Sequence, residues 1–229
     1  MTTGKRLHYS YEDYLGLLDQ SEFKLEFCDG VIYARASGTI SHAALSAAAI
    51  GIIRQALGTA CTVFSSDLKV RIDASDLSTF PDVSVVCGPQ EPAANDAHAL
   101  TNPTLLVEVT SRSTEDYDRG DKLSHYKQLP ALRAVLFVSH RTRAVTLVQP
   151  NGEGWEEREF RAGERVVLTS PRLSFGVDEL YAGLALEPRY LTTASRRAAR
   201  ISAPGDPTRS SASCRCAASG GTRGDRGRC

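Results

Sequence analysis

The sequence predicts an α/β protein in which helices pack against a β-sheet. Helical patterns alternate with short extended runs along much of the chain, and a strand-rich stretch follows them. The runs 104–111 and 134–140 are almost continuously apolar, which is typical of buried strands. A chain of 229 residues with 41% hydrophobic content is long enough for one core of ordinary size.

Two of the predicted helices have recognisable ends. In 10–20, Ser10 precedes acidic residues and an apolar stripe, so we expect a short amphipathic helix. In 41–58, Ser41 is a suitable N-cap and Gly58 a suitable C-cap. Apolar residues occupy nearly every side of this second helix, which predicts that it is well buried.

The segments beside these helices predict strands. Segment 23–36 holds two extended runs around Asp29 and Gly30, which is the pattern of a β-hairpin. Segment 61–73 alternates apolar and polar residues, so one strand is expected there. The alternation assigns three polar residues to a solvent-exposed face: Asp67, Lys69 and Arg71.

The second half of the chain predicts further strands and one more helix. Strands at 80–88 and 104–111 are joined by a polar loop, 89–103. A helix at 118–130 follows, with Asp118 as its N-cap and a proline beyond its end. The remaining predicted strands are 134–140, 144–150, 155–161 and 165–170.

The zero net charge hides two unlike parts. Residues 189–229 contain nine Arg, no Lys and two Asp, so this tail carries +7 and residues 1–188 carry −7. The tail has few large apolar residues and cannot offset the entropy of ordering, so we expect one domain at 1–188 and a disordered basic tail at 189–229. Such a tail either binds nucleic acid through phosphates or is an inert extension.

Targeting signals and cysteines suggest a location. The N-terminus lacks the pattern of a signal peptide, and the longest apolar run is too short to cross a bilayer. We therefore expect a cytoplasmic protein without a membrane partner. Cys28, Cys61 and Cys87 have neither zinc-site nor disulfide-scaffold spacing, so buried thiols in a reducing compartment are expected.

One carboxylate stands where none is expected. Glu108 lies in the middle of the apolar run 104–111, and an ionised carboxylate is costly to bury unless it is paired or bound to a metal. Asp82 begins the preceding predicted strand, so the two carboxylates can converge on one Mg²⁺. Lys122 lies near the start of the following helix, one turn from Tyr126. Taken singly, each residue also has a structural explanation. Asp82 fits a turn, Glu108 fits an ion pair with an arginine, and Lys122 fits a solvated helix face.

Several short motifs, in this order and spacing, resemble one protein family. The Pro-Asp pair and the Glu-Val pair at the end of an apolar strand are similar to the PD-(D/E)xK pattern of restriction-endonuclease-like nucleases. Over residues 9–184 the chain resembles the Uma-two family, a set of bacterial proteins assigned as endonucleases with this fold. The motifs that carry the likeness are KLEFCDGVIYA, SH, FPDVSVV, PTLLVEVTSRST and YDRGDKLSHYKQL.

The resemblance implies a fold and a site. The fold would be a mixed β-sheet flanked by helices, with extra β-hairpins at the N- and C-terminal ends. The usual lysine position holds Thr110, a departure, and the family pattern places the lysine at Lys122 instead. The implied catalytic residues are Asp82, Glu108 and Lys122. The implied ligands of Mg²⁺ or Mn²⁺ are Glu26, Asp82, Glu108 and the carbonyl of Val109, and His42 would contact a phosphate.

Two functions remain open from the sequence. The first is a metal-dependent endonuclease that hydrolyses DNA, acting as a homodimer as many nucleases of this fold do. The second is a nucleic-acid-binding or regulatory protein that kept the fold and lost turnover. The acidic balance of residues 1–188 argues against strong nonspecific DNA affinity of that domain alone.

Overall fold

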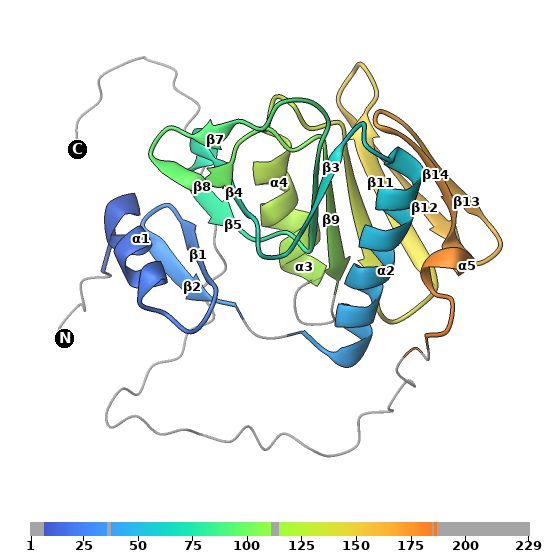
Figure 1. The fold of residues 1–229 in the computed structure, drawn as a ribbon, viewed down its shortest axis with the longest axis horizontal. Coiled ribbons are helices and arrows are strands. Elements are labelled where there is room, and N and C mark those ends of the chain that lie inside the picture. Colours follow the sequence, from blue (N-terminus) through green and yellow to red (C-terminus); the bar gives the residue numbers. More distant parts are fainter. Residues whose placement is uncertain (1–6, 36–37, 111–114, 185, 187–229) are drawn as a thin grey trace, which may run out of the picture.

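The fold is a mixed α/β architecture of the expected class, with β-sheets flanked by helices (Figure 1). A computed structural model describes residues 7–35, 38–110, 115–184 and 186. The predicted hairpins lie at opposite ends of the molecule: β1 and β2 at one end, β13 and β14 at the other. The predicted basic tail, 189–229, lies outside the described residues, so the predicted domain division stays untested.

A six-stranded central sheet forms the core of the molecule. Its strands are β3 (Thr62–Ser65), β6 (Val83–Val86), β9 (Leu105–Thr110), β10 (Ala134–Ser139), β11 (Ala144–Pro150) and β12 (Trp155–Arg161). Their spatial order is β12-β11-β10-β9-β6-β3, with β9 and β10 parallel and the other neighbours antiparallel. The apolar runs that predicted buried strands are therefore β9 and β10, at the middle of this sheet.

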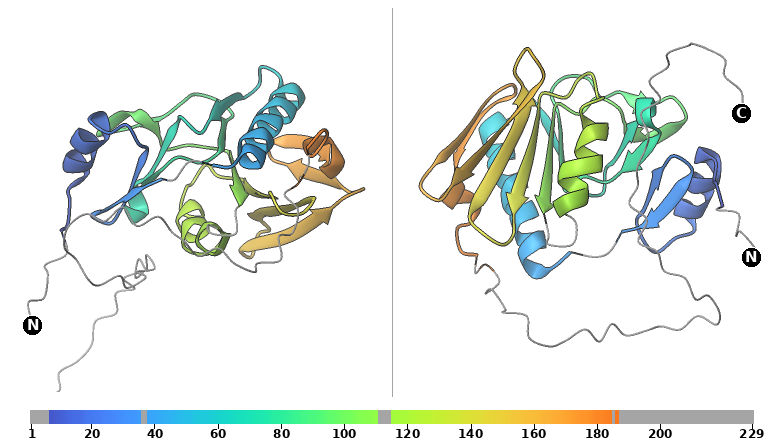
Figure 2. Two further views of the ribbon diagram at one scale, coloured as in Figure 1. Left: turned by 90° about the horizontal axis from the view of Figure 1, so that it is seen from below. Right: turned by 180° about the vertical axis from the view of Figure 1, so that it is seen from behind.

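Both faces of the central sheet are covered. One face packs against α2 (Ile40–Leu57) and against the hairpin of β13 (Arg165–Thr169) and β14 (Arg172–Gly176), followed by α5 (Val177–Leu180). The other face packs against α4 (Leu123–Tyr126), as the view from behind in Figure 2 shows. Alternate residues of β9 serve the two faces: Leu105 and Val107 join the α2 side, and Leu106 joins the α4 side. Glu108 therefore points to the α4 side.

A second sheet lies beside the central one. Its strands are β1 (Leu25–Cys28), β2 (Val31–Ala34), β4 (Lys69–Ile72), β5 (Leu77–Thr79), β7 (Pro92–Ala93) and β8 (Asp96–Leu100). Helix α1 (Tyr11–Asp19) precedes β1 in the chain, and the short helix η1 (Asp73–Ser75) joins β4 to β5. The strand order is β2-β1-β5-β4-β8-β7. Apolar residues of this second sheet, Val70, Ile72 and Leu77, share one buried cluster with α4, so the two sheets and α4 meet in a common core.

The local signals at the N-terminal end are confirmed. Ser10 caps α1 in a capping box with Asp13, because each side chain accepts a hydrogen bond from the other residue's backbone N–H. Asp29 and Gly30 both have positive φ, 44° and 75°, which is the geometry of a two-residue hairpin turn.

Helix α2 differs from its prediction in two respects. Its N-cap is Thr39, whose side chain accepts from the His42 N–H, rather than Ser41. Only one stripe of it is buried, Leu45, Ala49 and Ile53, so the prediction of a well-buried helix was wrong. By length and composition α2 also meets the criterion for a membrane-crossing helix, a test that core helices of soluble proteins pass as well.

The alternation in segment 61–73 led to a wrong prediction. Two strands of different sheets, β3 and β4, occupy it, separated by a turn. Lys69 and Arg71 are buried, each 5% exposed, rather than solvent-facing. Lys69 Nζ lies 2.6 Å from Asp96 Oδ2, and Arg71 pairs with Asp73 and Asp76. Asp96 belongs to segment 89–103, which was predicted as a loop but contains the strands β7 and β8.

The helical segment after β9 begins earlier than predicted. It starts with α3 (Glu115–Tyr117), continues through a π-helical turn, η2 (Asp118–Lys122), and ends with α4. Asp118 is consequently inside the segment and does not cap it. A π turn inserts an extra residue and shifts the side chains beyond it, and such turns are frequent at functional sites. Lys122 is the last residue of this turn.

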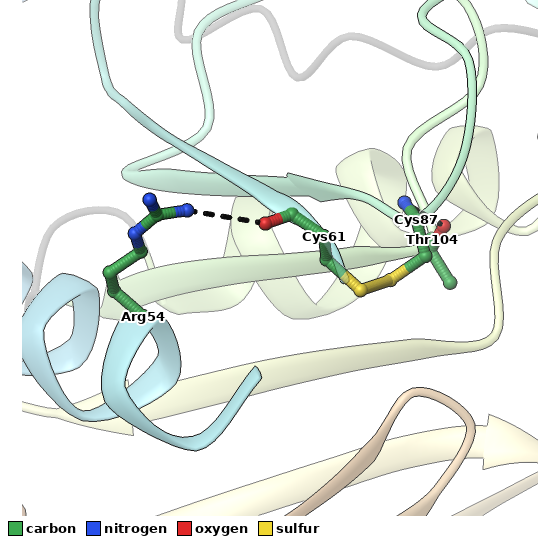
Figure 3. The surroundings of a disulfide bond; sticks show 4 residues. All are labelled: Arg54, Cys61, Cys87 and Thr104. Carbon is green, nitrogen blue, oxygen red and sulfur yellow. Dashed lines mark hydrogen bonds between the residues drawn. A yellow bond between two sulfur atoms is a disulfide. The ribbon is translucent and has the colours of Figure 1, made fainter. Parts of the chain in front are cut away.

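Two cysteines form a disulfide, contrary to the prediction of three buried thiols. Cys61 and Cys87 are bonded although 26 residues separate them (Figure 3). The cause is strand register: Thr62 pairs with Val86 across β3 and β6, and the two cysteines are the next residues outward on each strand. Cys28 is buried as predicted and is not part of a disulfide.

Candidate active site

Asp82 and Glu108 meet at one end of the β6–β9 pair. The register of these strands pairs Val83 with Val107, so Asp82 and Glu108 are the next residues on each strand. The Val109 N–H donates to Asp82 Oδ2 at 2.8 Å. Both carboxylates are almost fully buried, with 2% and 1% exposure. The structure therefore brings the two sequence-predicted acids into one buried site.

Lys122 reaches Glu108 from the helical segment. Its Nζ lies 2.8 Å from Glu108 Oε1, and both side chains are buried. The Tyr126 hydroxyl donates to the same Glu108 oxygen. Lys122 and Tyr126 are four residues apart and lie on one face of the helical segment. The apolar strand can hold a carboxylate because a buried ammonium and a phenol pair with it.

Two further carboxylates face Lys122. Glu26 of β1 lies with its Oε1 3.9 Å from Lys122 Nζ and accepts a hydrogen bond from Thr79 Oγ1 at 2.7 Å. Asp118 Oδ1 is also 3.9 Å from Lys122 Nζ. Glu26 was predicted from the sequence as a site residue, whereas Asp118 was predicted only as a helix cap.

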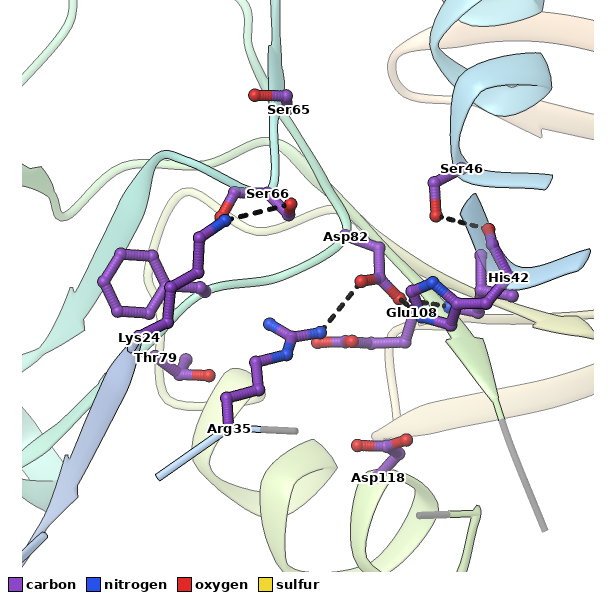
Figure 4. A network of polar contacts seen from close by, with 12 residues as sticks. Lys24, Arg35, His42, Ser46, Ser65, Ser66, Thr79, Asp82, Glu108 and Asp118 are labelled. Carbon is purple, nitrogen blue, oxygen red and sulfur yellow. Dashed lines mark hydrogen bonds and ion pairs between the residues drawn. The ribbon is translucent and has the colours of Figure 1, made fainter. Parts of the chain in front are cut away.

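His42 approaches Asp82 from the first turn of α2. Its Nε2 lies 3.1 Å from Asp82 Oδ2, and its side chain is 21% exposed (Figure 4). His42 is thus part of the site, and its role toward a phosphate stays a prediction. The role of the Val109 carbonyl as a metal ligand also stays a prediction. Val109 lies beside Asp82, because its N–H donates to that carboxylate.

Arg35 belongs to the site but was not predicted. Its Nη2 donates to Asp82 Oδ1 at 2.8 Å, and its Nη1 lies 3.7 Å from Glu26 Oε1. Figure 4 shows the guanidinium pointing at the carboxylates of Asp82 and Glu108. A signal existed in the sequence: the two-residue turn pairs Glu26 with Tyr33, and Arg35 lies two residues further along the same face of the hairpin.

The cluster carries a surplus of negative charge. Glu26, Asp82, Glu108 and Asp118 supply four carboxylates, and Arg35 and Lys122 supply two permanent positive charges. Burial raises the pKa of Glu108 to about 7 despite the opposing effect of Lys122. Burial alone would lower the pKa of Lys122, but Glu108 and Glu26 outweigh it and hold that pKa above its ordinary value.

The other two acids behave differently. For Asp82, burial favours the neutral form, but the His42 hydrogen bond and Arg35 outweigh it and hold the pKa below its ordinary value. The pKa of Glu26 is also below its ordinary value, because the positive charges of Lys122 and Arg35 outweigh the effect of burial. These two carboxylates are therefore ionised at neutral pH, and Glu108 is the acid for which burial outweighs the positive charge of Lys122.

The donor set fits a divalent cation in its chemistry. Carboxylate oxygens are the hard ligands that Mg²⁺ and Mn²⁺ take, and one divalent ion would balance four acids against two bases. Within the described residues, no three potential ligands stand ready as a preformed metal group. The reason is visible in the contacts: Arg35, His42 and the Val109 N–H hold Asp82, while Lys122 and Tyr126 hold one oxygen of Glu108.

A family model, two curated proteins and a solved structure are similar to this chain. The Uma2 family, described as "Putative restriction endonuclease", matches residues 11–186. The uncharacterised Synechocystis protein slr1290 is 38% identical over 178 residues, 77% of this chain and 93% of its own length. A second uncharacterised Synechocystis protein, sll1609, is 28% identical over 142 residues, 62% of this chain and 80% of its own length.

A crystal structure from Anabaena variabilis, described as a "putative nuclease belonging to DUF820", superposes with a TM-score of 0.61. It is 18% identical and covers 74% of this chain and 96% of its own, so it supports the fold alone. Together with the family match over most of the domain, these likenesses confirm the restriction-endonuclease-like architecture. The chain belongs to the Uma2 family, whose description is "Putative restriction endonuclease".

Proposed function

We propose that this protein is a metal-dependent endonuclease that hydrolyses phosphodiester bonds in DNA. The observation that carries the proposal is the buried cluster in which Asp82 lies next to the Glu108 strand and Lys122 pairs with Glu108. Buried charge of this kind costs stability, which favours a chemical role of these residues over a purely structural one. The family and the fold are those of nucleases, which supports the same conclusion.

The residues divide the work as follows. Asp82, Glu108 and Glu26 would hold Mg²⁺ or Mn²⁺, with the Val109 carbonyl as a further oxygen donor. The ion, when bound, supplies Lewis-acid polarisation of a phosphoryl oxygen and activation of water. The pKa of Lys122 is raised by its neighbours, so its ammonium stays charged and is suited to stabilise charge that develops on the phosphoryl group.

The proposed substrate is DNA. His42 is 21% exposed at the edge of the cluster, where a phosphate of the backbone can reach it. The domain is acidic overall, so we expect binding to depend on the metal and on local cations rather than on the whole surface. A cytoplasmic location and a homodimer remain predictions.

A cleavage assay tests the proposal. Purified protein is incubated with supercoiled, linear and branched DNA and with RNA, with Mg²⁺, with Mn²⁺ and with EDTA. We expect metal-dependent cleavage of at least one DNA substrate, with loss of cleavage in Asp82→Asn and in Glu108→Gln. Cleavage that persists in both variants would place the active site elsewhere.

A second candidate is a nucleic-acid-binding protein without turnover. The observation that favours it is the occupation of Asp82 by Arg35, His42 and the Val109 N–H. In that case DNA binds with the same affinity with and without metal, and no substrate is cleaved in any of the assays.

A further inference from the structure

Two permanent cations face the carboxylates, and they differ in exposure. The Lys122 side chain is 3% exposed, whereas the Arg35 side chain is 23% exposed. Arg35 directly follows β2, and its backbone N–H donates to the Lys24 carbonyl at 2.9 Å, which extends the hairpin by one pair. Arg35 is therefore the more solvent-exposed of the two cations.

The guanidinium of Arg35 is only partly engaged. Its Nη2 donates to Asp82, but its Nη1 is buried and donates no hydrogen bond to any described residue. The nearest carboxylate oxygen to Nη1 among the ion pairs, Glu26 Oε1, is 3.7 Å away. A buried donor without a partner is costly, so a group that could accept from Nη1 would gain by binding there.

Arg35 also holds the oxygen that a metal needs. Asp82 Oδ2 contacts the Val109 N–H and His42, whereas Oδ1 contacts Arg35 alone among the described residues, so Oδ1 has the fewer partners. A divalent cation on Oδ1 would stand beside the guanidinium, and two like charges at that distance repel. This repulsion would favour an Arg35 side chain that has moved away from Asp82 when a metal binds there.

A phosphodiester is the natural acceptor for the displaced side chain. The planar fork of arginine matches two phosphoryl oxygens, and charge-assisted bonds of this geometry are the strong ones. We infer that Arg35 holds the place of the metal on Asp82 in the free protein and binds the substrate phosphate once the metal has displaced it. This inference rests on the proposed function, since it assumes a metal at Asp82 and a phosphodiester substrate.

Metal titration tests the first half without relying on activity. Mn²⁺ binding is measured by calorimetry in the wild type, in Arg35→Gln and in Arg119→Gln. Arg119 is the matched control because it is 29% exposed and pairs with the carboxylates of Glu115 and Glu157, away from Asp82. We expect Arg35→Gln to bind Mn²⁺ severalfold more tightly than wild type, because a competing cation is gone, and Arg119→Gln to be unchanged. Weaker Mn²⁺ binding in Arg35→Gln would overturn the inference.

DNA binding tests the second half. Anisotropy of a labelled duplex is measured over a salt series with Ca²⁺, another oxygen-binding cation, and with EDTA; a gel checks that the DNA stays intact. Loss of one phosphate contact lowers the slope of log affinity against log salt by about 0.9. We expect that change in Arg35→Gln only when the metal is present. An unchanged slope with metal overturns the inference.

One further variant and a comparison with the wild type distinguish failure of the role of Arg35 from failure of the proposed function. If Arg35→Gln does not fold, Arg35→Lys decides: it keeps the charge but loses the fork, so DNA affinity with metal should fall, and unchanged affinity would contradict a phosphate contact. If the wild type neither binds Mn²⁺ nor cleaves DNA, the proposed function fails. If the wild type does both and Arg35→Gln matches Arg119→Gln, only the role of Arg35 fails.

Discussion

Lys122 Nζ lies 2.8 Å from Glu108 Oε1, and the two side chains are 3% and 2% exposed. A lysine reaches the apolar strand from the next helical segment, although the usual position of the catalytic lysine, two residues after the glutamate, holds Thr110. The π turn η2 sets the position of Lys122 over the strand end. The cation expected beside the glutamate is thus supplied from a different element.

The first prediction concerns this lysine. Lys122→Ala should lower the rate of DNA cleavage by about 10²–10⁴-fold, the usual range for one group that acts on proton transfer or transition-state charge. Mn²⁺ binding should persist, because Lys122 is not among the proposed ligands. Single-turnover cleavage and calorimetry on the same preparation measure the two quantities.

Lys69→Ala is the control for that experiment. Lys69 is also buried beside a carboxylate, Asp96, but this pair belongs to the second sheet. The variant should lose stability and keep the cleavage rate of its folded fraction. Equal cleavage by wild type and Lys122→Ala would show that another residue supplies the cation.

The second prediction concerns metal and stability. Mn²⁺ at 100 times its Kd should stabilise the native state by about 2.7 kcal/mol, since the ion binds only the folded site. For a domain of this size that corresponds to a Tm increase of roughly 5–10 °C. The double variant Asp82→Asn, Glu108→Gln should show no such increase in a thermal melt.

The matched control removes two exposed acids instead. Glu12→Gln, Glu153→Gln changes the net charge equally and leaves the cluster intact, because both residues are exposed. Its response to Mn²⁺ should equal that of the wild type. An identical metal response in all three proteins would mean that the stabilising ion binds outside the cluster.

The sequence predicted the fold class and the approach of Asp82 to Glu108 in the candidate site, but only part of the strand pairing around them. Glu108 in an apolar strand is a conflict that only a partner can resolve, and this conflict located the site in the sequence. Arg35 was missed because a lone arginine at a strand end resembles any surface cation. The place of Arg35 beside Glu26 can be predicted only when the strand register of the hairpin is extended by one pair, so that Arg35 lies opposite Lys24.

Long-range pairing explains the wrong predictions. Alternation correctly predicted extended structure in 61–73, but it could not show that β3 and β4 enter different sheets. Lys69 is buried because Asp96 arrives from β8, within a segment whose polar composition predicted a loop. The Cys61–Cys87 bond follows from the pairing of β3 with β6, which no cysteine spacing encodes.

The third prediction concerns the pH dependence of stability at Asp96. Burial favours the neutral acid, but hydrogen bonds from Lys69 and Tyr11 outweigh it, so the pKa of Asp96 is lowered on folding. A lowered pKa contributes stability above the unfolded value, near pH 4, and this contribution is lost as the pH falls through the folded value. Asp96→Asn should therefore cost about 1–3 kcal/mol at pH 7 and less at pH 3.

Urea unfolding at several pH values measures this difference. Asp178→Asn is the control, because Asp178 pairs with Arg143 at the surface, where its side chain is 49% exposed. That variant should differ little from wild type at any pH. A cost of Asp96→Asn that is the same at pH 3 and pH 7 would show that the ion pair does not contribute through its charge.

The last prediction concerns the disulfide at the far end of β6. This strand has Asp82 before its first residue and Cys87 after its last, so the Cys61–Cys87 bond fixes the strand that carries a site aspartate. A crosslink over 26 residues restricts the unfolded chain and typically contributes about 2–4 kcal/mol. Cys61→Ser, Cys87→Ser should therefore melt well below the oxidised wild type, and reductant should lower the Tm of the wild type toward that of the variant. The variant itself should not respond to reductant, which separates this bond from any effect of the other cysteines in residues 189–229, namely Cys214, Cys216 and Cys229. Rapid alkylation of both Cys61 and Cys87 in folded, unreduced protein, read by mass spectrometry, would show that the bond is absent.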